Sequence, residues 1–234
     1  MAMSGDIPSY DRSLHRRPNP KAPRKGRAKR LTYRHGNLRE ALIVEAVKLM
    51  EEREDSAFAL REVAQRIRVS HTAAYRHFPN KGALLAEMAK RGFGILAEAL
   101  EASLAAGKTS DEVVRGQARA YIKVALKNRA LFRCMFGPRK FGPENNDAVD
   151  KSCDVCFDLL NRAAMRLSEE HQISAPASET SLAIWSMVHG LTNLALDGQL
   201  CDLGDEETQE GYEQMADKSA RQLMSGLIPR VRRR

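Results

Sequence analysis

The sequence predicts an all-α fold, and three observations support that prediction. Apolar residues recur with a helical period from residue 37 onward, caps and helix breakers separate the periodic stretches, and no stretch alternates apolar and polar residues as a half-buried strand does. The chain has 234 residues, of which 43% are hydrophobic and 29% charged. A chain of this length and composition can bury a full core in one or two domains.

The first part of the periodic region predicts four helices. Their expected ranges are 37–53, 60–67, 71–78 and 81 to about 104. Ser70 is a good N-cap for the third helix, Pro79 cannot continue it, and Asn80 can cap the fourth. The second and third helices, separated by a short turn, predict a helix-turn-helix. In that motif the first helix braces against the DNA backbone and the second lies in the major groove.

A second group of helices follows a joint at 107–110. Either Thr109 or Ser110 can cap the first of them, which carries Val124 and Ala125. Beyond it we expect a short apolar segment at 131–136, a loop at 137–146 and a helix from 149 to about 167 that is broken at 171–176. Two further helices are expected at 178–197 and 206–227.

The net charge is +8 at pH 7, and basic residues crowd both ends of the chain. This balance favours polyanionic partners, nucleic acid first. We expect residues 1–34 to form a disordered basic arm and residues 229–234 a basic tail. Two interpretations of the arm stay open: it reaches DNA beside the helix-turn-helix, or it is a solvated segment. No apolar run suits a bilayer span or a signal peptide, so we expect a cytoplasmic protein without a membrane partner.

The third helix has the sequence HTAAYRHF, which suits close approach to DNA. His71 and Thr72 can donate or accept hydrogen bonds at base edges, and the methyl groups of Thr72 and Ala73 can meet a thymine methyl group. Tyr75, Arg76 and Lys81 are placed to hold phosphates, which sets register and supplies salt-dependent affinity. Lys81 also stands at a helix start, where backbone N–H groups favour an anion.

The segment from Gly36 to about Leu100 resembles the DNA-binding domain of the TetR family. The resemblance rests on LREVAQRI at 60–67, on Val69-Ser70, and on YRHFPNK at 75–81 with Leu84-Leu85 after it. It implies a helix-turn-helix domain at 35–80, a connecting helix at 81–106, and a helical domain at 107–228 that binds a small molecule and dimerises. It also implies that Phe78 anchors the third helix in the core. The residues expected at DNA are Arg68, Ser70, His71, Thr72, Ala73, Tyr75, Arg76, His77 and Lys81.

Two positions depart from the family pattern. Family members often have Gly where this chain has Arg68, and a positive φ there would store strain on the order of 1 kcal/mol. Arg68 is alternatively a phosphate contact. The family also often has Ser or Thr where this chain has Ala59, and the missing cap would cost about 1 kcal/mol.

A second resemblance lies in AIWSMVHGL, where Trp185, His189 and Gly190 are similar to a TetR subgroup with a Trp-His-Gly signature. Trp185 and His189 share a helix face, and Gly190 would let another helix approach closely. Two interpretations stay open for the aromatic and Met side chains of this half. They line an effector pocket, or, as we favour, they fill the core or the dimer seam. The candidate pocket residues are Phe132, Met135, Phe136, Phe157, Trp185 and His189.

Cys153 and Cys156 form a C-x-x-C motif that invites a redox or metal interpretation. No second Cys or His pair lies at ligand spacing, so we favour buried thiols and expect no metal and no cofactor. His171 falls in an expected loop and needs no role.

Three hypotheses follow for function. The first is a dimeric transcription repressor that binds a near-palindromic operator in double-stranded DNA and is released by a small-molecule effector. The second is a non-specific DNA-organising protein that binds mainly through its basic ends. The third is a thiol enzyme, which would need a base near a reactive cysteine; we expect no enzyme.

Overall fold

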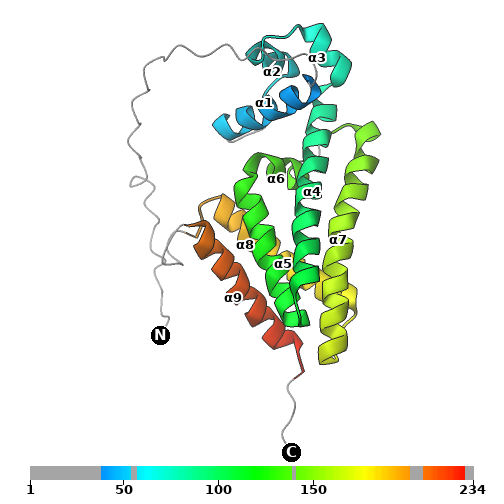
Figure 1. Cartoon of the computed structure of the whole chain (residues 1–234), viewed down its shortest axis with the longest axis vertical. Coiled ribbons are helices and arrows are strands. Elements are labelled where there is room, and N and C mark those ends of the chain that lie inside the picture. Colours follow the sequence, from blue (N-terminus) through cyan, green and yellow to red (C-terminus); the bar gives the residue numbers. More distant parts are fainter. Residues whose placement is uncertain (1–37, 54–56, 139–140, 201–207, 230–234) are drawn as a thin grey trace, which may run out of the picture. The chain divides into compact units, whose positions relative to one another are not determined.

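A computed structural model describes residues 38–53, 57–138, 141–200 and 208–229 (Figure 1). Every regular element within these ranges is an α-helix, which confirms the all-α prediction. The basic arm at 1–34 and residues 230–234 of the tail lie outside the described residues, as does Cys201. No described helix is long and apolar enough to cross a membrane.

The helices follow the expected order. They are α1 (Leu38–Arg53), α2 (Leu60–Arg66), α3 (His71–His77), α4 (Lys81–Ala106), α5 (Ser110–Lys127), α6 (Arg129–Phe136), α7 (Pro143–His171), α8 (Ala177–Leu196) and α9 (Gln209–Leu227). The expected loop at 137–146 is too long, because α7 already begins at Pro143. Proline is favoured in a first helical turn, since its fixed φ suits the helix and its missing N–H has no partner there.

Side-chain caps start four of these helices, α3, α4, α5 and α9, the last through Thr208. Ser70 Oγ accepts a hydrogen bond from Ala73 N at 3.2 Å, and Asn80 Oδ1 accepts one from Ala83 N at 2.8 Å, as predicted. At α5 the cap is Thr109 rather than Ser110, in a capping box with Glu112. Ala59 provides no side-chain cap to α2.

One apolar core joins the first helices to the rest. Phe78, 2% exposed, ends α3 inside this core, as the family resemblance implied. Beyond α3, α4 packs on α5, α6 and α7, and α5 packs on α9 and α8. A Cβ atom on Gly92 of α4 would lie 2.4 Å from Met135 Sδ, so glycine allows α6 to approach α4 closely.

Gly190 has no close neighbour within the described part of the chain. Nothing in the described residues lies within 4 Å of the place that a Cβ atom would take there, so no described helix of the same chain approaches it. The residue is exposed on α8, and the close approach of another helix stays a prediction for a partner subunit.

Candidate nucleic-acid interface and aromatic cluster

The turn between α2 and α3 depends on Arg68, whose φ is +59°. The left-handed conformation lets Arg68 N donate to Gln65 O at 3.1 Å and Val69 N donate to Ala64 O at 3.0 Å, which ends α2 and reverses the chain. A non-glycine residue stores about 1–2 kcal/mol of strain in this conformation. The backbone at the position where the family often has glycine is therefore strained, and the Arg68 side chain is exposed.

The α3 helix has a buried face and an exposed one. Ala74 and Phe78 are buried, and Ala73 is half-buried. The exposed face carries most of the side chains expected at DNA, namely His71, Thr72, Tyr75, Arg76 and His77. Tyr75 is 47% exposed, which makes it one of the few large hydrophobic side chains of the described residues that are not buried. The exposed face thus offers hydrogen-bonding and cationic groups on one short helix.

Two other expected DNA residues already have intramolecular contacts. The Ser70 hydroxyl oxygen accepts the capping hydrogen bond from Ala73 N. The Lys81 ammonium group lies 4.5 Å from the centroid of the Phe58 ring, which is a cation–π distance. Both groups retain donors, because a hydroxyl that accepts still has its proton and an ammonium has three.

Ion pairs between residues far apart in the sequence link α1 to α4. Arg91 donates to Glu40 at 2.7 Å, and Arg39 donates to Glu87 at 2.9 Å. The hydrogen bond from Arg39 is the main reason why the pKa of Glu87 falls to about 2. The partners are 48 and 51 residues apart, so the sequence offered no local signal for them.

A separate cluster of aromatic rings surrounds Tyr121 of α5. Tyr121 is 1% exposed, and its hydroxyl oxygen lies 2.9 Å from His189 Nδ1. Trp185 Nε1 donates to the same oxygen at 3.4 Å. Burial lowers the pKa of His189, which favours a neutral ring that accepts the Tyr121 proton at Nδ1. The sequence analysis did not single out Tyr121. The one feature that could have indicated its role is a side chain with a hydroxyl group on the apolar face of a predicted helix.

The structure brings most of the candidate pocket residues into this cluster. The ring centroid of Phe136 is 4.8 Å from those of both Phe132 and His189, and Trp185 lies 6.2 Å from Phe157. Met135 is the exception, because its side chain meets Gly92 of α4 instead. Phe136, Phe157, Trp185 and His189 are only half-buried, whereas Phe132 is buried.

The short helix α6 has contacts on two sides. Phe132 and Phe136 point into the aromatic cluster. Cys134 Sγ donates to Met50 Sδ of α1 at 3.6 Å. A displacement of α6 would therefore be felt by both the cluster and the first helix.

Two of the described cysteines, Cys134 and Cys156, are buried and lack the accessibility of a reactive thiol. Cys156 is buried, its Sγ donates to Phe93 O at 3.3 Å, and burial raises its pKa to about 12. Burial likewise raises the pKa of Cys134 to about 12. Cys153 is half-buried. In the described part of the chain, no three His, Cys, Asp or Glu side chains are grouped to hold a metal ion.

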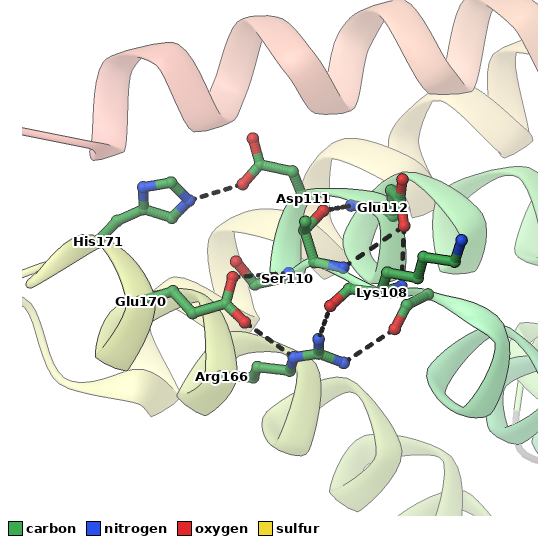
Figure 2. A network of polar contacts seen from close by, with 9 residues as sticks. Lys108, Ser110, Asp111, Glu112, Arg166, Glu170 and His171 are labelled. Atoms are coloured by element: carbon green, nitrogen blue, oxygen red, sulfur yellow. Dashed lines mark hydrogen bonds and ion pairs between the residues drawn. The ribbon is translucent and has the colours of Figure 1, made fainter.

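A polar network ties the end of α7 to the joint between α4 and α5 (Figure 2). Arg166 donates to Gly107 O at 3.0 Å, and Ser110 N donates to Glu170 Oε2 at 2.8 Å. His171 Nε2 lies 2.7 Å from Asp111 Oδ1. The prediction that His171 lies in a loop without a role is wrong, because His171 ends α7 and pairs with a carboxylate that lies 60 residues earlier.

Comparison with known proteins identifies the fold. The TM-score is 0.70 to a Rhodococcus sp. RHA1 protein of unknown function, which is 27% identical over 85% of this chain and 100% of the other. It is 0.63 to the TetR family transcriptional regulator PfmR of Thermus thermophilus, 22% identical over 80% and 95% of the chains. It is 0.64 to a tetR-family regulatory protein of Rhodococcus RHA1, 17% identical over 81% and 96%. No curated protein matches the sequence significantly.

Two family models match the sequence itself. Residues 42–88 match the bacterial regulatory proteins of the tetR family, and residues 114–218 match the tetracyclin repressor-like C-terminal domain. Together they span well over half of the chain. Neither description mentions a Trp-His-Gly signature, so that subgroup stays a prediction. The chain belongs to the TetR family of bacterial regulatory proteins, and it is a DNA-binding transcriptional regulator.

Proposed function

We propose that this regulator is a repressor that binds a near-palindromic operator as a homodimer and leaves it when a small-molecule effector binds. The observation that carries the proposal is the position of α6, which contacts both the aromatic cluster and α1. The domain bounds 35–80, 81–106 and 107–228 belong to this proposal.

The DNA contacts that we propose follow from the exposed face of α3. Thr72 and His71 read base edges, with Ala73 close enough for a methyl contact, because these residues stand in the first turn of the helix. Phosphate contacts come from the side chains around them, namely Arg68, Ser70, Tyr75, Arg76, His77 and Lys81. Such contacts fix the register of the helix without reading sequence.

The proposed dimer uses α8 and α9. Leu182 and Leu194 of α8 are 53% and 46% exposed, and Gly190 lies between them on the same face with open space above it. Spacings of eight and four residues keep these positions on one side of a helix. A second copy that covers this face would bury both leucines. A two-fold axis would then present two α3 helices to successive major grooves, which requires a near-palindromic site.

The effector site that we propose is the aromatic cluster. Its half-buried rings offer apolar faces, and His189 Nε2 offers a polar group when Tyr121 occupies Nδ1. An effector that separates Phe136 from His189 would displace α6, which also packs against Gly92 of α4 through Met135. The effector shifts the equilibrium only by its difference in affinity between the operator-binding state and the other state.

Footprinting of genomic fragments at moderate salt tests the repressor. We expect protection of a near-palindromic sequence with two half-sites, and its loss on adding the right effector. A matched protein that lacks residues 1–34 separates the alternatives, because it should keep the footprint at lower affinity. Binding without sequence preference, or a footprint that disappears with the arm, would favour the DNA-organising protein instead.

A further inference from the structure

A groove lies outside the aromatic cluster, and most of its lining residues come from α4, α5 and α9. These three helices are labelled in Figure 1. Its volume is about 620 Å³, which is within the size range of small-molecule sites. The groove exists because small residues face one another where α4 and α5 pack. A Cβ atom on Gly116 would lie 3.4 Å from Ser103 Cβ, and Ala102, Ala106 and Ala120 add an apolar lining.

The wall of the groove is cationic. Arg115, Arg119 and Lys123 follow one another at four-residue spacing along α5, so their side chains share a face. Tyr121 of the same helix is buried in the aromatic cluster. The groove and the cluster are therefore separate sites on two faces of α5.

Three guanidinium groups converge on one carboxylate at the edge of this groove. Asp217 of α9 accepts from Arg115 Nε at 2.9 Å, from Arg221 Nε at 2.9 Å, and from Arg119. Three positive charges on one negative charge leave an excess of two. A guanidinium has five N–H donors, and Asp217 takes only a few of them. The Arg115 and Arg119 side chains are 25% and 42% exposed, so further donors are accessible to a ligand.

The acidic residues of the groove reduce this excess but do not reverse it, because including Lys123, Glu112 and Glu213 in the count leaves a net charge of +1. The Glu112 carboxylate accepts from Lys108 N at 2.8 Å and Thr109 N at 3.4 Å, so it is directed at backbone N–H groups. The Glu213 carboxylate is 3.8 Å from Lys123 Nζ, which is longer than a hydrogen bond.

We propose that this groove binds a small organic anion that carries a phosphate group. Arg115, Arg119 and Lys123 hold the phosphate oxygens, since guanidinium groups match their geometry with paired N–H donors. The apolar part of the ligand lies over Ala106 and Ala120. This site is independent of the proposed effector site.

Isothermal titration calorimetry of the full chain with inorganic pyrophosphate tests the phosphate subsite. The double variant Arg119→Gln/Lys123→Gln should weaken binding at least about tenfold, because two charge-assisted contacts are removed. Ala120→Leu changes the apolar lining without changing charge, so pyrophosphate, which has no apolar part, should bind this variant about as it binds the wild type. The matched control is Arg162→Gln, at an exposed arginine of α7, which should bind as the wild type does.

Pyrophosphate can also bind the helix-turn-helix, so the titration is repeated in an Arg68→Gln/Arg76→Gln background. The effect of the double variant should persist there. No binding at millimolar pyrophosphate, or binding that the double variant does not weaken, would overturn the proposal. A loss of DNA affinity in Arg119→Gln/Lys123→Gln without a loss of pyrophosphate binding would also overturn it, because the groove would then be a DNA surface.

Discussion

In the helix-turn-helix, the side chains proposed to meet DNA come from one continuous segment and are mostly exposed. The side chains of the aromatic cluster, in contrast, come from α5, α6, α7 and α8 and pack on one another. The difference follows from the two tasks. A groove of DNA is read by the outer face of one helix, whereas a small molecule must be surrounded by several elements. The first kind of site is local in sequence and the second is not.

Removing the anchor of α3 should have the largest effect. Phe78→Ala should reduce the free energy of unfolding by about 3–5 kcal/mol, because Phe78 is almost completely buried. Urea denaturation measures this loss, and operator binding should fall with it. Tyr75→Phe is the control, since Tyr75 is exposed and should leave stability within about 0.5 kcal/mol. If the Phe78→Ala protein kept the stability of the wild type, Phe78 would not be the side chain that anchors α3 in the core.

The exposed face of α8 gives the next largest effect. Leu182→Glu/Leu194→Glu should weaken dimer formation by about 2–4 kcal/mol, because two exposed leucines that the proposed dimer would bury would become charged. Light scattering on a dilution series measures the dimer. Met165→Glu is a matched control, at a 50% exposed residue of α7. A double variant that stays as dimeric as the control would place the seam elsewhere.

Within α3, phosphate and base contacts should respond differently. Arg76→Gln should weaken binding to all sites alike, by about 1–2 kcal/mol, and reduce the salt slope by about one. Thr72→Ala should instead change base preference, with the salt slope unchanged. Binding assays on operator variants at several salt concentrations measure both. If Arg76→Gln altered preference at a single base pair, its assignment to phosphate would be wrong.

The missing cap of α2 predicts a smaller effect in the opposite direction. Ala59 has the extended backbone of an N-cap (φ −109°, ψ 145°) but no side-chain acceptor. Ala59→Ser should therefore stabilise the protein by about 1 kcal/mol, seen as a higher Tm. Ala59→Val, which cannot accept a hydrogen bond, is the control. Equal melting temperatures for Ser and Val would show that no N–H group of α2 needs the cap.

The aromatic cluster should show the smallest effect, through pH. Burial lowers the pKa of His189 below the 6.5 of an unfolded chain, so the folded state favours the neutral ring. The stability from this group is present above pH 6.5 and is lost as the pH falls below it toward the folded pKa. His189→Gln should flatten the fall of Tm in this range, whereas His77→Gln, at an exposed residue, should not. An unchanged pH profile in His189→Gln would mean that its protonation is not linked to folding.

Local patterns determined the helices and their caps. Ser70 and Asn80 were predicted as caps because a cap acts on N–H groups two or three residues away. The α2–turn–α3 motif was predicted for the same reason, since it is contained in residues 60–78. Apolar spacing likewise located α5, α7, α8 and α9, although it gave only an apolar segment for α6 and missed that Pro143 already begins α7.

Only the tertiary structure decided which distant side chains meet. Tyr121 and His189 are 68 residues apart, Arg115 and Asp217 are 102 apart, and His171 finds Asp111 across the joint. Periodicity shows which face of a helix is buried, but it does not show which neighbour covers that face. The open space at Gly190 and the cationic groove beside Asp217 depend on how helices cross, and that geometry results from the packing of the whole core.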